Sequence, residues 1–242
     1  MRTLLSALVL AAAFGLALPA AAQSSDARFD RADPNGSRLF LSPTGRTMGR
    51  GTGRVGTYAI LPTAAYAPSD WIDVQAFSSI PMDVDGAGGN GSVGVYGLGL
   101  KSQVYRAERV AVAVGATAFS LYGVDTGGAF VGTVYGAATF GTSESSVTLG
   151  LTGLYGGAVE AGVGLAEGAA VSVGLERQVS NSLKLISENY LGLGEDGAAG
   201  GTLTGVRFFG DRLSADFALA VTATGSGLHL APAPYVGLSY RF

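Results

Sequence analysis

The single histidine, His229, is the side chain of this chain best suited by its pKa to acid–base chemistry near neutral pH. It lies between two leucines in the stretch GSGLHLAP, which matches no lipase or deacylase motif. A histidine-dependent hydrolase also needs a nucleophile and an orienting group that the fold places beside the imidazole, and the nearby Ser226 lies in a Gly-Ser-Gly turn. We therefore predict no catalytic residue and interpret His229 as a loop or rim residue.

Two aspartates, Asp83 and Asp85, precede a glycine-rich stretch at residues 86–91. Carboxylates and backbone carbonyls are ligands that calcium prefers, but the spacing here is loose. The glycine-rich stretch also lacks the Lys-Ser/Thr pair and the following helix of a phosphate-binding loop. The chain contains no cysteine, which removes thiolate metal sites. We predict a solvated loop, no metal and no cofactor.

Several charged residues occur in stretches where apolar side chains recur at every second position. Lys184 and Glu188 have one parity, and Leu183, Leu185 and Leu191 have the other. Successive side chains of a strand point to opposite faces, so these stretches predict strands with one apolar face and one charged face. The charges of this kind are Lys184, Glu188, Glu176, Arg207 and Asp216.

Both ends of the chain carry features of an exported membrane protein that spans the bilayer with β-strands. Arg2, the apolar residues 4–18, Pro19 and the alanines before Gln23 predict a cleaved secretory signal peptide over residues 1–22. The last eight residues, YVGLSYRF, alternate apolar with small or polar side chains and end on an aromatic residue. A strand of this type resembles the closing strand of bacterial outer-membrane β-barrels, which implies an assembly signal. That signal would be formed by Val236, Leu238, Tyr240 and Phe242.

The composition agrees with a barrel in a membrane. The chain has 242 residues, 39 of them glycine, and its mean hydropathy is +0.35. After the signal peptide no clean apolar stretch reaches the roughly 18 residues of a spanning helix. An apolar chain without such helices can satisfy its backbone groups in a bilayer by closing a barrel. The net charge of −3 argues against a nucleic-acid partner.

Turn signals divide the mature chain into short strand-like stretches. Residues 37–47 could add a first strand, which gives an all-β, antiparallel transmembrane β-barrel of about twelve strands, with ten as an alternative. Residues 23–36 are then a mobile periplasmic lead, and the barrel covers residues 37–242. The other predicted strands are residues 55–66, 71–80, 93–105, 110–122, 129–140, 147–155, 169–179, 183–193, 202–209, 213–222 and 234–242.

In such a barrel the five strand charges should face the lumen. A lysine or arginine facing lipid near the midplane costs about 2–4 kcal/mol. Two interpretations of the inward charges remain open. They either form ion pairs that fill and rigidify a narrow barrel, or they line a charged constriction of a small-solute pore.

Five stretches carry a resemblance to a known group of proteins. They are RLFLSPTGR at residues 38–46, residues 58–66, VYGAATFGTSESSVTLG at 134–150, LISENY at 185–190 and VRFFGDRLSADF at 206–217. With the terminal strand, they resemble a family of uncharacterised outer-membrane β-barrel proteins of Gram-negative bacteria. The resemblance implies the fold and the bacterial outer membrane as location, and it brings no reaction with it.

The sequence favours a non-enzymatic integral outer-membrane barrel, either a small-solute channel or a structural barrel. Its expected partners are outer-membrane lipid and the machinery that inserts barrels. Two alternatives remain, an outer-membrane enzyme acting on lipid or surface polymer, and a soluble secreted β-sandwich adhesin.

The lengths of the connections predict which end of the barrel faces the periplasm. Barrels of this class have short periplasmic turns and longer external loops, and here the short turn at 180–181 contrasts with the glycine-rich stretch 156–168. A cysteine replacing Gly162 should therefore react with an impermeant thiol reagent on whole cells, whereas one replacing Asn181 should not. The absence of native cysteine gives a clean background, and the opposite labelling pattern would invert the predicted topology.

Overall fold

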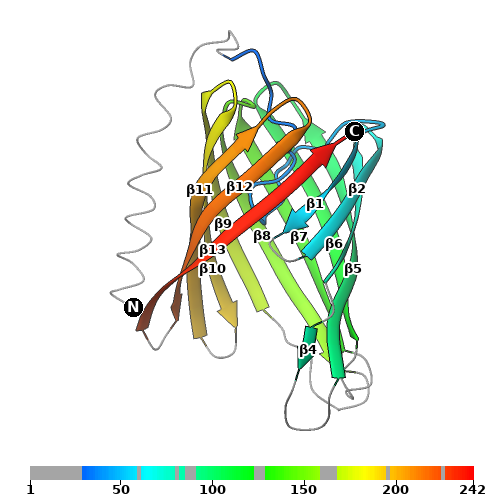
Figure 1. Cartoon of the computed structure of the whole chain (residues 1–242), viewed down its shortest axis with the longest axis vertical. Helices are drawn as coiled ribbons and strands as arrows, with labels where there is room; N and C mark the ends of the chain where they lie inside the picture. Colours follow the sequence, from blue (N-terminus) through cyan, green and yellow to red (C-terminus); the bar gives the residue numbers. More distant parts are fainter. Residues whose placement is uncertain are drawn as a thin grey trace.

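The computed structural model describes residues 29–58, 61–79, 82–84, 91–122, 129–158, 168–194, 197–224 and 227–242 (Figure 1). All regular elements of this part are strands, and none of it forms a helix able to cross a membrane. The strands are β1 (Gly53–Tyr58), β2 (Leu61–Ser69), β3 (Ile72–Ser78), β4 (Met82–Val84), β5 (Gly91–Arg106), β6 (Val110–Tyr122), β7 (Ala129–Gly141), β8 (Ser145–Ala158), β9 (Gly168–Ser180), β10 (Leu183–Gly194), β11 (Gly197–Phe209), β12 (Leu213–Thr224) and β13 (Gly227–Arg241).

The strands form one closed antiparallel barrel. Neighbours in sequence pair with each other, and β1 pairs with β13 to close the sheet. Both β3 and β4 pair with β5, at successive positions, so they act as two pieces of one barrel strand. The 13 strands of the sheet therefore make a barrel of twelve, as the sequence predicts. This closed barrel excludes the β-sandwich alternative.

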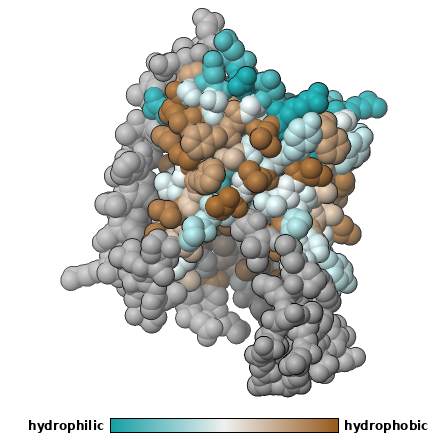
Figure 2. Space-filling model, viewed as in Figure 1, coloured by the Kyte–Doolittle hydropathy of each residue, from teal (hydrophilic) through white to brown (hydrophobic). Residues whose placement is uncertain are grey.

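The two faces of the wall differ as period-two patterning requires. On β5, Leu98 and Leu100 are exposed, whereas Lys101 and Gln103, of the other parity, are buried toward the lumen. Figure 2 shows apolar side chains spread over the visible side of the barrel and hydrophilic ones gathered at the end with the short turns. The outer face is therefore the one that lipid can cover, as in a barrel that spans a membrane.

The number of strands agrees with the prediction, but two of the strand assignments do not. The predicted strand 55–66 is two strands, β1 and β2, because the apolar stretch continues across their connection and hides it. The predicted first strand, residues 37–47, is not part of the wall. It has a single isolated bridge, between Arg38 and Pro43. The two errors compensate in the strand count.

The N-terminal segment lies inside the barrel (Figure 1). We call residues 33–48 the plug segment. Its Leu39 and Phe40 are buried and pack with the wall residues Ile186, Leu203 and Tyr235. The prediction of a mobile lead is therefore wrong for residues 33–36, and the barrel wall begins at β1 instead of at residue 37. The predicted signal peptide and residues 23–28 lie outside the described residues.

A glycine of the wall makes room for the plug segment. A Cβ added to Gly174 of β9 would lie 2.0 Å from Leu39 Cδ1. No side chain is compatible with that approach unless Leu39 moves. The small residues of the inner face thus create the space that the plug segment occupies.

The seam between β1 and β13 depends on the last residue. The amide of Phe242 donates to the carbonyl oxygen of Gly53 at 2.9 Å, and the amide of Gly53 donates back at 2.9 Å. A Cβ on Gly53 would lie 2.3 Å from the Phe242 ring, so the ring covers this glycine. Val236, Leu238, Tyr240 and Phe242 are all exposed on the outer side of the seam.

We expect Phe242 to be needed for assembly. Deleting Phe242 should remove most of the heat-modifiable barrel from the outer membrane, because it removes the two hydrogen bonds to Gly53 and the aromatic terminus. Phe242→Asp keeps the backbone hydrogen bonds to Gly53. It should also lower the amount of assembled barrel if the insertion machinery recognises the aromatic C-terminal side chain. Phe242→Tyr is the matched control and should assemble normally, while normal levels of the deletion variant would contradict the expectation.

Candidate functional site

The most completely buried ion-pair cluster in the described lumen is centred on Arg207 of β11, whose side chain is 0% exposed. Its guanidinium binds both carboxylate oxygens of Asp216 on β12, at 2.6 and 3.1 Å. It also binds Asp33 of the plug segment at 3.0 Å and donates to the carbonyl oxygen of Leu39 at 2.6 Å. Arg207 therefore joins an acid of the wall to an acid and a carbonyl of the plug segment.

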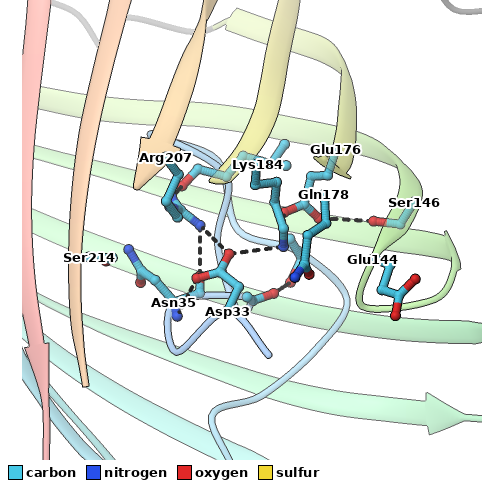
Figure 3. Close-up of polar contacts among 12 residues, drawn as sticks. Asp33, Asn35, Glu144, Ser146, Glu176, Gln178, Lys184, Arg207 and Ser214 are labelled. Carbon is cyan, nitrogen blue, oxygen red and sulfur yellow. Dashed lines mark hydrogen bonds and ion pairs between the residues drawn. The ribbon is translucent and has the colours of Figure 1, made fainter. Parts of the chain in front are cut away.

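Asp33 is shared between two wall cations (Figure 3). The oxygen that binds Arg207 also lies 2.9 Å from Nζ of Lys184 on β10. Burial opposes ionisation of this carboxyl, but Arg207 and Lys184 outweigh it and hold the pKa of Asp33 well below its usual range. Asp33 is thus charged at neutral pH, which the docked position of the segment requires.

Lys184 extends the cluster to the neighbouring strands. Its ammonium lies 3.3 Å from Glu176 of β9, whose other oxygen accepts a 2.9 Å hydrogen bond from Ser146 of β8. Arg46 of the plug segment lies 3.9 Å from the same carboxylate. The structure therefore brings four of the five sequence-selected charges into one network: Glu176, Lys184, Arg207 and Asp216.

Glu188, the fifth, does not pair with Lys184 as their shared face suggested. Its carboxylate accepts hydrogen bonds from the backbone amides of Leu41, at 2.9 Å, and Ser42, at 3.4 Å. The Tyr190 hydroxyl donates to it as well. Residues four apart on a strand are too far separated for a short-range pair, so Glu188 instead holds the plug backbone.

A second polar group lies on the opposite side of the lumen. Lys101 of β5 pairs with Asp73 of β3 at 3.0 Å and donates to the carbonyl oxygens of Ser37 and Arg46, at 3.0 and 2.7 Å. The Arg38 guanidinium lies 4.1 Å from the centroid of the Tyr58 ring, a cation–π contact.

The described residues enclose two cavities between the plug segment and this side of the wall. The inner cavity, of about 370 Å³, is bounded by β1, β2, β3, β5–β8, Tyr190 of β10 and plug residues. The outer cavity, of about 300 Å³, lies at the short turn between β5 and β6. Met48 of the plug segment lines both cavities and so lies between them.

Sequence reasoning missed the plug side of the site. Asp33 and Arg38 were assigned to the periplasmic lead and to a strand, because nothing local marks a segment that folds back into a lumen. Lys101 carries a usable signal, since it is a charge of inward parity on the predicted strand 93–105, whereas Arg54 lies one residue before the predicted strand 55–66. Among the described residues no group of three or more metal-ligating side chains occurs. The prediction of a loop is wrong for Asp83, which lies in β4, and His229 lies near the start of β13. The side chains of Asp83, Asp85 and His229 lie outside the described part.

Comparison with known proteins shows similarity in fold and none in sequence. No protein-family model matches the chain, and no curated protein matches it. A KdgM porin in complex with disordered oligogalacturonate is similar, with a TM-score of 0.55, 7% identity, and coverage of 79% of this chain and 98% of the porin. Another KdgM porin structure gives 0.52 at the same identity and coverage. LpxR from Salmonella typhimurium, at 0.44 and 8% identity over 79% of this chain and 98% of that one, adds no argument. The porin likeness shows the fold, an outer-membrane β-barrel.

The ion pairs predict that Asp33 holds the plug segment in place. Asp33→Asn leaves Lys184 and Arg207 one acid short, and breaking a buried pair costs about 3–5 kcal/mol. Amide hydrogen exchange in residues 33–46 should accelerate, while exchange in the wall strands stays unchanged. Asp33→Asn with Lys184→Met should cost less than the sum of the single changes. Asp30→Asn, at an exposed position three residues before Asp33, is the control. Unchanged exchange in Asp33→Asn would contradict this role.

Proposed function

We propose that this protein is a non-enzymatic small-solute channel of the outer membrane, narrowed by its own N-terminal segment. The observation that carries the proposal is the pair of cavities on either side of Met48. The two cavities lie in succession along the wall, the inner one in the lumen and the outer one at the turn between β5 and β6. The route runs beside the plug segment, so the segment restricts the lumen without filling it.

The asymmetric packing of the plug segment supports this route. Residues 33–42 contact β9–β13 through Arg207, Lys184, Glu188 and the apolar cluster around Phe40. On the other side the wall carries small or polar inward residues such as Ala65, Thr117 and Thr133, which border the inner cavity. A structural barrel alone would not need an open side.

In this proposal the five lumen charges have two roles. Glu176, Lys184, Arg207 and Asp216 form the ion pairs that dock the plug segment, and Glu188 fixes its backbone. They act as structural charges that set the position of the constriction. The charges that line the route are instead those of the inner cavity, Arg38, Arg54, Asp73 and Lys101, and those of the outer cavity, Arg46, Arg106 and Glu108.

Two further assignments belong to the same proposal. The five resembling stretches support membership in the family of Gram-negative outer-membrane barrels named above. The exposed stripe ending in Phe242 supports recognition by the machinery that inserts outer-membrane barrels. The KdgM porins, one of them in complex with disordered oligogalacturonate, agree with a channel but give this chain no solute.

The size of residue 48 should control conductance. Met48→Gly should raise the single-channel conductance in planar bilayers severalfold, because it widens the point between the two cavities. Met48→Trp should lower it. Leu98→Ala truncates a lipid-facing side chain that is 69% exposed and should leave it unchanged. If neither wild type nor Met48→Gly conducts, the protein is a structural barrel instead.

A further inference from the structure

Arg54 of β1 is a buried cation to which the described residues supply no acid. Its side chain lies in the lumen, and the residue is only 6% exposed. The guanidinium donates to the side-chain oxygen of Asn35 and, at 3.3 Å, to Ser37 Oγ. Both acceptors are neutral, and none of the ion pairs formed within the described part of the chain includes Arg54. A buried charge without a counter-charge is costly.

The neighbouring groups supply no acid to Arg54 that is not already paired with another cation. Arg38 donates to the same oxygen of Asn35 at 3.1 Å, so two guanidinium groups share one neutral acceptor. The two acids of this region are already paired: Asp216, which lies 3.6 Å from Arg38, is bound by Arg207, and Asp73 is paired with Lys101. Asn35 is 1% exposed, and its amide nitrogen has no hydrogen-bond partner among the described atoms. Donors therefore outnumber acceptors on this side of the plug segment.

These cations border the inner cavity. Arg38, Arg54 and Lys101 all line it, and Asp73 is the acid among its lining residues. Its volume of about 370 Å³ is at the lower end of the range for small-molecule pockets. Glu188 lies behind the backbone of Leu41 and Ser42 and is satisfied there by three donors.

The rest of the cavity wall is suited to an apolar body. Phe77 and Phe119 pack against each other with ring centroids 4.6 Å apart, and both border the cavity. Tyr58 and Tyr135 add two more aromatic rings. A guanidinium group matches the geometry of a carboxylate, to which it can donate two parallel hydrogen bonds.

From this combination we propose that the inner cavity binds a compact organic carboxylate, with its carboxylate on Arg54 and its apolar or ring-shaped body against Phe77 and Phe119. The bound carboxylate supplies the negative charge that the described lumen does not provide for Arg54. The inference deepens the proposed channel by naming the class of its solute, and it rests on that proposal only for the solute's passage.

Isothermal titration calorimetry on the folded mature chain in detergent tests the site. The probe is benzoate, and benzamide is its neutral isostere, each corrected for heats in empty micelles. Benzoate should bind saturably and about tenfold or more tighter than benzamide. Inorganic phosphate, which has the charge without the ring, should bind more weakly than benzoate. Equal affinity for benzoate and benzamide would overturn the proposal that the site binds a negative charge. Phosphate binding as tight as that of benzoate would overturn the proposal that the site also binds the organic part of the ligand.

Variants locate the binding. Arg54→Gln should weaken benzoate by about tenfold or more and leave benzamide unchanged, whereas Arg212→Gln, at an exposed turn, should change neither. Ala65→Phe fills the same cavity while keeping every cation, and it should also weaken benzoate if Arg54→Gln fails to give a heat-modifiable barrel. Benzoate affinity unchanged in Ala65→Phe or in folded Arg54→Gln would overturn the site.

The outcome is separable from that of the channel proposal. If the conductance responds to residue 48 but the protein does not bind benzoate, the channel proposal stands and the carboxylate site is overturned. If benzoate binding needs Arg54 but the protein does not conduct, the carboxylate site stands and the channel proposal is overturned; the barrel then binds the carboxylate without transporting it.

Discussion

A guanidinium group fully enclosed in the lumen needs negative charge around it, and Arg207 obtains that charge from two different parts of the chain. Asp216 comes from the adjacent wall strand, and Asp33 comes from the segment that precedes the wall. The carbonyl oxygen of Leu39 completes the shell. Because a buried cation without partners is costly, this requirement fixes the N-terminal segment against one side of the barrel.

That one-sided attachment determines the shape of the remaining lumen. Leu39 and Phe40 pack against the same side of the wall as the ion pairs. The segment then crosses the lumen toward Lys101. The free space is left along the opposite strands, where Arg54 and the aromatic residues lie. Arg207 and Lys184 engage Asp33, Asp216 and Glu176 on the docked side. Arg54, on the other side, is left without an acid among the described residues.

The wall could be predicted from the sequence because period-two alternation is a local signal. Stretches such as β12 show both faces within a dozen residues, and lipid restricts the outer face to apolar side chains. The lumen could be predicted only in part. The inward direction of Lys184 or Arg207 follows from parity, whereas their partner Asp33 lies about 150 residues or more away in sequence. No local pattern distinguishes a strand from an apolar segment such as residues 37–47 that packs inside a barrel, and only the closed wall supplies its surroundings.

The contacts of the plug segment also constrain the order in which the molecule can be assembled. Phe40 accepts a hydrogen bond from Tyr235 at 3.2 Å, across a separation of 195 residues. Contacts between residues so distant in sequence form late, because the intervening chain must be ordered first. Residues near the start of the described chain therefore acquire their final surroundings only when the last strand is in place. Burial of the plug segment therefore indicates that the wall is complete, and a barrel whose seam is still open also lacks its constriction.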